Sequence, residues 1–588
     1  MDEKIRLYSM EELYHYGLDE VVKLFLERQT AEMKRLAEYN ETSRKLTNAL
    51  EEIRLLKAKL YGSSTETAGS LGIDKKENEH PNESQDTSES GRPESSSDLK
   101  STDEGRTKER RRPKRSSGCM KKQREGLPVI DVDDTIDEKD LKEIFGNGKI
   151  SELPPAGYDV VRMRPAFCYI EHHNIHVYKS GKKIVRACLT EKLLPHSDIS
   201  SSTMAYMLNG RFAMNLPANR ICQEMARNGY PINRQRVYSL TEHFAFKVFE
   251  LVIERMKQVM FSTRHIQADE TEIIMNEKRK DGHVVASRMW VYLTSERNEA
   301  ALPKVVIYQF ELTRGTDNLR DFIQGFSGTI TRDAYASYIV IDKDKEIDIT
   351  VSGCMTHARR KYVDALKALS GFRYLEKAEK EKVPAYVAAK KIGKIFTADK
   401  KLNDLEPGER LARRQIEVAP LVDDFFEYVH SFKDTDFTKG GLSYKAFNYS
   451  KNQEKYLRLF LTDGHIPLEN SASERKVISV ALGRNGWKTI ATIDGATAAG
   501  YMYSLAETAK ENGARPYYYY KYLLEKAGAL QKKHEDDGIE NLEYLDPMMP
   551  WSEEYRQYEK SEILRDNSIQ RQIALDEQTK NTQNVNAL

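Results

Sequence analysis

The sequence carries almost no net charge and no long apolar run. Its 92 lysine and arginine residues face 91 aspartate and glutamate residues, which leaves a formal net charge of +1. This balance does not by itself indicate a nucleic-acid partner, although the charges are unevenly placed. No apolar run approaches the roughly 18 residues of a membrane helix, and the mean hydropathy is −0.67. We therefore predict a soluble protein with no membrane partner.

Cysteine is scarce, and the start of the chain lacks a secretion signal. The 5 cysteines are too few and too scattered for a disulfide framework. The N-terminal Met1-Asp2-Glu3-Lys4 lacks the basic-then-apolar pattern of a signal peptide. Both features predict a reducing, cytoplasmic location.

The chain is long, and its composition changes along it. With 588 residues, several domains are expected rather than one. Residues 1–62 read as a helical segment with a short heptad seam, which predicts either a dimerising coiled coil or an amphipathic helix packed on its own chain. One set of seam positions holds Tyr39, Leu46, Ile53 and Leu60, and the other holds Leu36, Ser43, Leu50 and Lys57.

Residues 63–126 form a linker rich in Ser, Glu, Asp and Lys. With almost no aliphatic residues it cannot bury enough apolar surface to fold, so it is predicted to be disordered. Its first part is acidic and its end is basic, from Arg106 to Arg124. The segment is either a solvated linker or a mobile arm that adds salt-dependent contacts to DNA phosphates.

Two small regions follow the linker. Residues 127–195 read as short strands punctuated by proline and glycine, which predicts a small β domain. Residues 196–262 read as helical, with two short helices around Gly229-Tyr230-Pro231. This second region is either a helix-turn-helix, with Arg234 and Arg236 placed to contact DNA, or an ordinary helical hairpin.

From about residue 263 the sequence predicts a multidomain α/β architecture with a ribonuclease-H-like core. The order of elements is β-β-β-α-β-α-β-α, beginning with the strand His265–Thr271. Residues 263–369 form the first part of this core, 370–455 a helical insertion, 456–526 the second part, and 527–588 a C-terminal tail.

Three acids fall where such a fold would bring them together. Asp269 lies on the first strand, Asp333 ends the fourth, and Glu474 opens a helix after the insertion. Clustered carboxylates can hold two Mg²⁺ ions, which clamp both oxygens of an in-line phosphoryl displacement. Glu474 has a local alternative, because Ser471-Ala-Ser-Glu474 also fits a helix capping box. Glu469 is a second candidate ligand.

An ordered set of motifs resembles the insertion-sequence-66 family of bacterial DDE transposases. The motifs of the core are HIQADET, WVYL, TRDAYASY, GCMTHARRKYVDA, ENSASERKV and ALGRNGWKTIAT. KLYGSSTE after the heptads and YLDPMMPW near the C-terminus also resemble family elements. The resemblance covers most of the chain and implies Asp269, Asp333 and Glu474 as the catalytic triad and metal ligands. Cys354 and His357 match a Cys-x-x-His pair that the family carries.

The resemblance implies DNA cleavage and strand transfer with Mg²⁺, for which Mn²⁺ can substitute. Its partners would be the element's terminal inverted repeats, target DNA, a second copy of the chain and small element-encoded accessory proteins. The protein would be cytoplasmic and associated with the nucleoid. The candidate DNA contacts are Arg234, Arg236, Arg359, Arg360, Lys361, Arg475, Lys476 and Arg484 for phosphates, with Trp487 stacking near a base.

Two departures from the family pattern matter. Ser180 and Lys183 stand where the family has a cysteine pair, so the small β domain resembles a zinc-binding module that has lost its cysteines, and zinc is not expected. Glu469-Asn470-Ser471 replaces the usual Asp-Asn-Asn. Two rival functions stay open, namely a catalytically silent DNA-binding protein with the same fold and a host nuclease of that fold.

Overall fold

The computed structural model divides the chain into two units; the described residues up to Tyr555 belong to the first, and those from Arg556 on belong to the second. Within them the described residues are 18–61, 168, 177–180, 183–186, 193–194, 197–278, 284–299, 301–313, 315–333, 340–342, 344, 347–537 and 541–585. The linker predicted at 63–126 and most of the small β domain predicted at 127–195 lie outside them. No helix in the described ranges combines the length and apolarity needed to cross a membrane.

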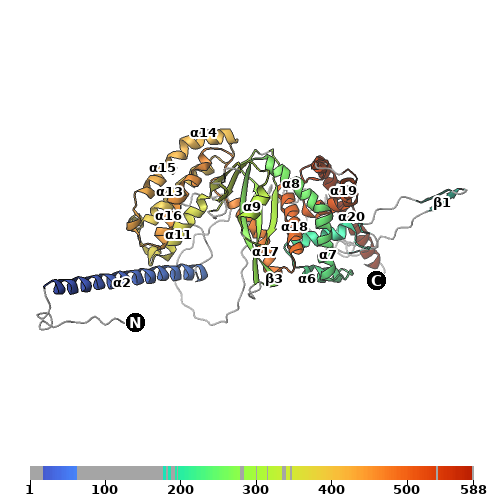
Figure 1. Cartoon of the computed structure of the whole chain (residues 1–588). Helices are drawn as coiled ribbons and strands as arrows, with labels where there is room; N and C mark the ends of the chain where they lie inside the picture. Colours follow the sequence, from blue (N-terminus) through green and yellow to red (C-terminus); the bar gives the residue numbers. More distant parts are fainter. Residues whose placement is uncertain are drawn as a thin grey trace, which may run out of the picture. The chain divides into compact units, whose positions relative to one another are not determined.

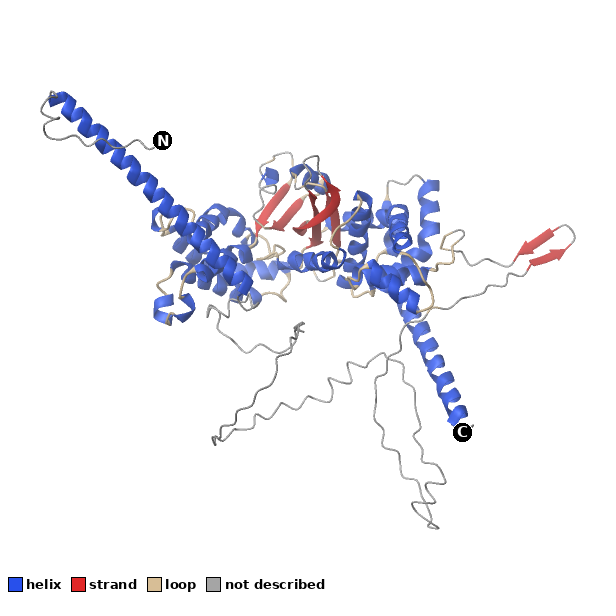
Figure 2. Cartoon of the chain, turned by 90° about the horizontal axis from the view of Figure 1, so that it is seen from below, coloured by secondary structure: helices blue, strands red, loops and turns tan. Residues whose placement is uncertain are grey.

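A mixed five-stranded sheet forms the centre of the first part (Figures 1 and 2). Its strand order is β5-β4-β3-β6-β7. The first three strands form an antiparallel meander, and β6 and β7 run parallel to β3. The strands are β3 (His265–Lys278), β4 (Val284–Thr294), β5 (Val306–Glu311), β6 (Gly328–Arg332) and β7 (Ile349–Gly353). The five strands predicted for this region are thus confirmed, with shifted ends.

The register between β3 and β6 depends on a glycine. Gly328 has a φ of +156°, and a Cβ placed on it would lie 2.0 Å from the Arg264 carbonyl oxygen. That carbonyl accepts a 2.8 Å hydrogen bond from the backbone N–H of Thr329. Only glycine allows this approach, because any side chain would push β6 away from β3. The contact sets Gln267 opposite Thr331.

Helices cover both faces of the sheet. On one face, Phe322 of α9 (Thr316–Ile323) stacks on Tyr292 at a centroid distance of 3.6 Å, and Phe261 of α8 (Glu250–Ser262) packs edge-on against Phe322. On the other face lie α17 (Ser471–Trp487) and α18 (Ile493–Glu511). Gly500 of α18 approaches the Tyr308 carbonyl so closely that a Cβ would lie 2.8 Å from its oxygen. Burial on both faces explains why the central strands are rich in apolar residues.

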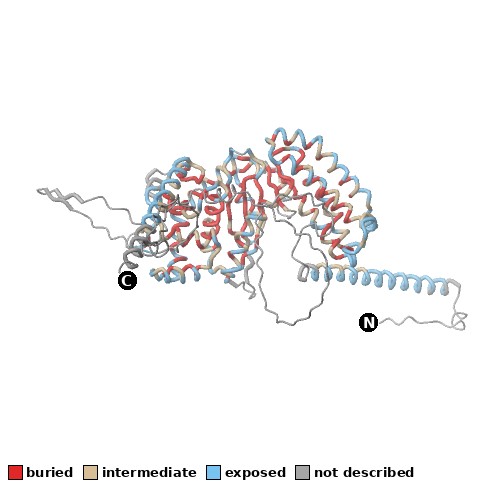
Figure 3. The backbone as a smooth tube through the Cα atoms, turned by 180° about the vertical axis from the view of Figure 1, so that it is seen from behind, coloured by how far each residue is buried: buried red, intermediate tan, exposed pale blue. Residues whose placement is uncertain are grey.

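A helical insertion separates β7 and the following helix from α17. Its apolar core is its own, and Figure 3 shows it as a band of buried residues. Tyr362 packs edge-on against Phe447, and the buried guanidinium of Arg414 pairs with Asp399 at 2.7 Å. The helix before the insertion is α11 (Met355–Ala368), which packs on this core. The helices of the insertion are α12 (Lys377–Lys380), α13 (Pro384–Lys400), α14 (Pro407–Glu417), α15 (Ala419–His430) and α16 (Leu442–Leu457).

The region before the sheet is helical, as predicted. It comprises α5 (Ser201–Leu208), α6 (Ala218–Arg227), α7 (Arg234–Phe244) and α8, with π-helical turns at Asn209–Ala213 and Ala245–Phe249. Gly229 ends α6 with a φ of +86°, a left-handed conformation that glycine adopts without strain. The Tyr230 N–H then bonds back to the Met225 carbonyl at 2.9 Å.

The ends of the chain hold long helices. The heptad segment lies within α2 (Leu18–Tyr61), a helix of 44 residues whose surface is mostly exposed in Figure 3. The C-terminal residues, from which the sequence pattern predicted no elements, form α19 (Pro516–Asp537) and α20 (Glu553–Val585). Charged residues recur all round α20, so it lacks the one-sided apolar stripe by which a helix is recognised. Of the small β domain, the hairpin β1 (Val177–Ser180) and β2 (Lys183–Arg186) is described, with Ser180 paired to Lys183.

Candidate active site

Asp269 and Asp333 occupy matched positions on neighbouring strands. Gln267 of β3 pairs with Thr331 of β6 in parallel register, and each aspartate follows its paired residue by two positions. Residues two apart on a strand point to the same face of the sheet. Asp269 therefore faces α17, and Asp333, which directly follows β6, is near enough to act electrostatically on its carboxylate. Glu270 points to the opposite face, as the alternation predicts.

Glu474 reaches this pair from the first turn of α17. The helix begins at Ser471 with Asn470 as its N-cap and has no side-chain cap, so the capping box is not formed. The Glu474 carboxylate lies instead 3.5 Å from Nε2 of His357 and 3.2 Å from the guanidinium of Arg360, both on α11. Its Oε1 atom, the one that faces His357, is buried and accepts no hydrogen bond from any residue that the structure describes.

The acids act on one another electrostatically. Burial raises the pKa of Asp269 from 3.8 to about 7, and the negative charges of Glu270, Asp333 and Glu474 add to the effect. The backbone N–H of Glu270 donates to Asp269 Oδ1 at 2.8 Å and opposes this rise in pKa. A buried carboxyl group with a raised pKa among other acids is suited to bind a cation, which would cancel the repulsion.

The loop before α17 is tied to β3 by a buried asparagine. Asn470 donates from Nδ2 to the Ala268 carbonyl at 2.8 Å, and its Oδ1 accepts from the Gln267 amide at 3.2 Å. Its backbone N–H donates to Sγ of Cys354 at 3.2 Å. These bonds set the position of Glu474 relative to β3. These hydrogen bonds could not be predicted from the residue types alone. The only hint in the sequence was that the family also has an asparagine at this position.

Cys354 and Glu469 contribute to packing rather than to the acid cluster. Cys354 is fully buried, and burial raises the pKa of its thiol to about 12, so the sulfur serves as an uncharged hydrogen-bond acceptor. Glu469 Oε2 accepts hydrogen bonds from Thr356 at 2.6 Å and from Ser471 at 2.9 Å. The two residues of the Cys-x-x-His pair therefore have different partners. Cys354 accepts a hydrogen bond from Asn470, whereas the ring of His357 faces Glu474.

The basic residues of α11 lie next to the acids. Arg360 is half-exposed and pairs with Glu474. The guanidinium of Arg359 lies 5.8 Å from the ring centroid of Phe396, and the ammonium of Lys361 lies 4.6 Å from that of Tyr449. Aromatic neighbours of this kind hold a cation in place without neutralising it.

The predicted DNA contacts on α17 differ in their surroundings. Arg475 is 62% exposed and lies 3.1 Å from Glu296. Lys476 is only 14% exposed and sits between Glu507 at 2.9 Å and Glu511 at 2.5 Å. Its ammonium group therefore joins α17 to α18 through ion pairs inside the protein, although the sequence predicted it as a phosphate contact.

Arg484, Trp487 and the two arginines of α7 complete the predicted set. Arg484 donates to the Glu272 carbonyl, and half-buried Trp487 hydrogen-bonds to the Tyr503 hydroxyl. Arg234 and Arg236 open α7 as exposed residues. They stand at a helix N-terminus, where backbone N–H groups also favour anions.

The donor set at Asp269, Asp333 and Glu474 fits Mg²⁺. It consists of carboxylate oxygens, which Mg²⁺ prefers, and it contains the orphaned Oε1 atom of Glu474. The three carboxylates are not all within 4.8 Å of one another. Among the described residues, the ligand atoms of His265, Asp463 and His465 do lie within 4.8 Å of one another.

Comparisons with known proteins agree on one family. The family model described as "Transposase IS66 family" matches residues 196–498. Among curated proteins, the uncharacterised protein y4hP of Sinorhizobium fredii is 26% identical over 55% of this chain and 58% of its own length. The uncharacterised protein y4jD of the same organism is 23% identical over 60% of this chain and 66% of its own length. The chain thus matches less than two thirds of the length of these relatives.

Proposed function

Because the chain belongs to the IS66 family of transposases, we propose that it binds the ends of an insertion sequence and carries out DNA cleavage and strand transfer. The observation that supports the proposal is the parallel register of Gln267 and Thr331, because Asp269 and Asp333 each follow their paired residue by two positions. The raised pKa of Asp269, which is caused first by burial and then by the neighbouring negative charges, supports a metal-binding role.

The order of the sheet supports a ribonuclease-H-like core. Three antiparallel strands are followed by two strands parallel to the first, in the order β5-β4-β3-β6-β7. In this arrangement the first and fourth strands of the core are neighbours; Asp269 lies on the first, and Asp333 directly follows the fourth. The helical insertion between α11 and α17 then separates the third acid in sequence while leaving it close in space.

In the proposed mechanism Asp269, Asp333 and Glu474 would hold two Mg²⁺ ions, for which Mn²⁺ could substitute. When bound, the ions would activate the attacking water or 3′-hydroxyl and stabilise the leaving oxygen of the phosphodiester. To hold them, Glu474 would give up its contacts with His357 and Arg360. Arg360 would then be able to contact a substrate phosphate beside the acids.

A cleavage assay tests the proposal. The protein is incubated with Mg²⁺ and a duplex that carries an end of the element, and with a scrambled duplex as control. We expect cleavage and a strand-transfer product from the first duplex, and loss of both in Asp269→Ala and Asp333→Ala. Cleavage by either variant would refute the triad. Cutting that ignores the end sequence would favour a host nuclease, and binding without any metal response would favour a silent DNA-binding protein.

The surface of α2 supports a homodimer as the acting form. With Leu36 and Leu50 at heptad positions a, the positions d include Tyr39, Leu46 and Ile53, and all five side chains are 43% to 70% exposed. The helix contacts its own chain through the opposite side, where Asn48, Glu51 and Glu52 bond to the segment around Lys439, Leu442 and Lys445. We propose that the free seam pairs with α2 of a second copy.

A further inference from the structure

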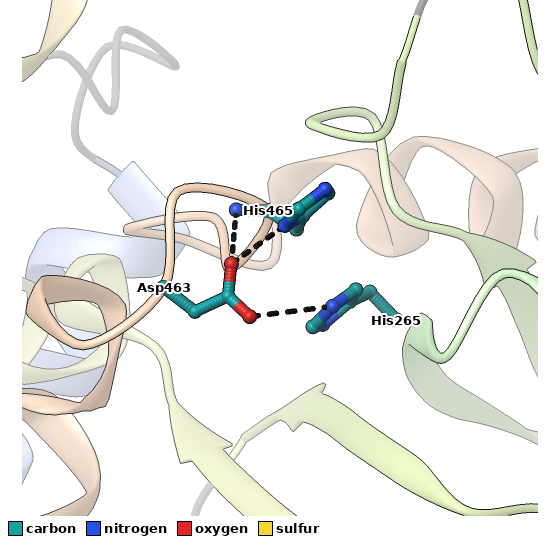
Figure 4. A group of neighbouring side chains, drawn as sticks. All are labelled: His265, Asp463 and His465. Carbon is teal, nitrogen blue, oxygen red and sulfur yellow. Dashed lines mark hydrogen bonds and ion pairs between the residues drawn. The ribbon is translucent and has the colours of Figure 1, made fainter. Parts of the chain in front are cut away.

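Three side chains outside the acid cluster meet at the start of β3. His265 opens the strand, while Asp463 and His465 lie in the loop after the short helix Leu459–Leu461. Their ligand atoms all lie within 4.8 Å of one another, and Figure 4 shows Asp463 reaching both imidazole rings. His265 precedes Asp269 by four residues, which is about 13 Å along an extended strand. The group is therefore separate from the acids.

A fourth side chain supports the group from outside. Asp463 Oδ1 lies 2.6 Å from Nδ1 of His465, and Oδ2 lies 3.4 Å from Nε2 of His265. The other ring nitrogen of His465 lies 3.0 Å from Oε1 of Glu299. Histidines that ligate metals characteristically have a carboxylate on the nitrogen that does not face the metal, because it fixes the tautomer and the ring orientation.

We propose that His265, Asp463 and His465 bind a divalent transition-metal ion of the zinc type, with Glu299 orienting His465. Two imidazoles and one carboxylate suit zinc, whereas Mg²⁺ prefers oxygen ligands. Three protein ligands leave the fourth tetrahedral position to water. This site does not depend on the proposed transposase function. It departs from the expectation that zinc is not bound, which rested on the lost cysteines of the small β domain.

The backbone that carries the three ligands is already held in place. The N–H of Ser295 donates to the His265 carbonyl at 2.9 Å, and its hydroxyl donates to the His465 carbonyl at the same distance. Arg410 donates to the Gly464 carbonyl at 2.7 Å. A ligand set on an ordered backbone loses little conformational entropy when it binds an ion. The ion would clamp the loop that leads to Glu474 onto the strand that carries Asp269.

Metal binding requires one local rearrangement. The two imidazole rings are stacked with their planes 1° apart and their centroids 4.7 Å apart, so their lone pairs run side by side instead of converging. The His265 ring must turn, and the proton between His465 and Asp463 must leave to solvent. Nδ1 of His265 is buried and makes no hydrogen bond to any described residue, so no bond at that nitrogen opposes the turn.

Zinc content tests the proposal. The full-length protein is stripped with a chelator, incubated with Zn²⁺ alone and desalted, and bound zinc per chain is measured by mass spectrometry. We expect Asp463→Asn and His265→Gln each to hold one zinc ion fewer than the wild type. His430→Gln is the matched control, because His430 also pairs with a carboxylate, Glu454 at 2.6 Å, far from the proposed ligands in sequence. It should retain the wild-type zinc content.

Equal zinc content in wild type and His265→Gln, or no zinc in the wild type, would overturn the site and leave a simple ion-pair network. If Asp463→Asn does not fold, His265→Gln decides, together with the visible absorption of the Co²⁺-loaded wild type, which this variant should lose. Asp269→Asn should keep the full zinc content. A negative DNA-cleavage assay would therefore not affect the zinc measurement. Failure of one proposal can be distinguished from failure of the other.

Discussion

The side-chain amide of Asn470 donates a 2.8 Å hydrogen bond to the backbone carbonyl of Ala268. Ala268 immediately precedes Asp269 on β3, and Asn470 is the N-cap residue of the helix that carries Glu474. Two acids that are far apart in the sequence are thereby linked through a short path of strand, side chain and helix. We expect the position of the third acid to depend on this buried contact.

Asn470→Ala tests that dependence. The substitution leaves the Ala268 carbonyl and the Gln267 amide without their partner, which costs about 1–3 kcal/mol of unfolding free energy when the groups are buried. We expect this loss in urea denaturation, together with a larger fall in DNA cleavage. Asn48→Ala is the matched control, because it removes an exposed amide-to-carbonyl bond to Lys439. A variant at Asn470 with full activity would show that the contact does not position the site.

The raised pKa of Asp269 predicts an unusual pH dependence of stability in the metal-free protein. The folded chain holds a proton on this carboxyl up to about pH 7, whereas the unfolded chain releases it near 3.8. The stabilising contribution is therefore complete below the unfolded pKa and is lost as the pH rises through the folded pKa. The acid stabilises the fold less and less across this window.

Asp269→Asn removes that titration. The variant should gain stability relative to the wild type as the pH rises from about 4 to about 7, by on the order of 2 kcal/mol, and the difference should then level off. Urea midpoints measured in a chelator at several pH values check this. A difference that stays constant with pH would mean that Asp269 is not buried among like charges. DNA cleavage should be lost at every pH.

Glu474 and Glu469 can be separated by their response to Mg²⁺. Glu474→Gln should abolish the Mg²⁺-induced rise in melting temperature and reduce cleavage by at least about a hundredfold, because a ligand of the ions is lost. Glu469→Gln should keep both, since the amide oxygen can still accept from Thr356 or Ser471. Thermal denaturation with and without Mg²⁺ decides the matter, and the reverse pattern would assign the ligand to Glu469.

The seam of α2 can be tested by a charge placed on it. Leu46→Glu puts a carboxylate at a heptad position d, where it would face its own copy across a dimer, and we expect the protein to become monomeric in sedimentation experiments. Glu51→Gln changes the side of α2 that contacts its own chain and should leave the oligomeric state unchanged. A dimer that persists in Leu46→Glu would place the interface elsewhere.

Local sequence was sufficient for the strands of the core and for the helices around Gly229. Alternating apolar residues identified β3 and β4, and Gly229 marked the end of α6, because these signals depend on near neighbours. The pattern did not identify α20, whose charges surround it on all sides. Asp269 and Asp333 were predicted to lie together because the expected ribonuclease-H-like order of elements, and the family resemblance, would bring them together.

Other features of the site depend on partners that the local sequence does not reveal. The structure shows that Glu474 does not cap α17 but contacts His357 and Arg360 of α11. Lys476, which the sequence suggested as a phosphate contact, is mostly buried between two glutamates of α18.

By itself the sequence determined the order of elements, the family and which residues carry negative charge. The tertiary structure decided which of these charges meet and what each one faces. It placed His265 beside Asp463 and His465, and it aligned Gln267 with Thr331 through the close approach of Gly328. The physical reason is that side-chain direction and neighbours follow from long-range packing and register, in which a shift of one residue along a strand turns every side chain to the other face.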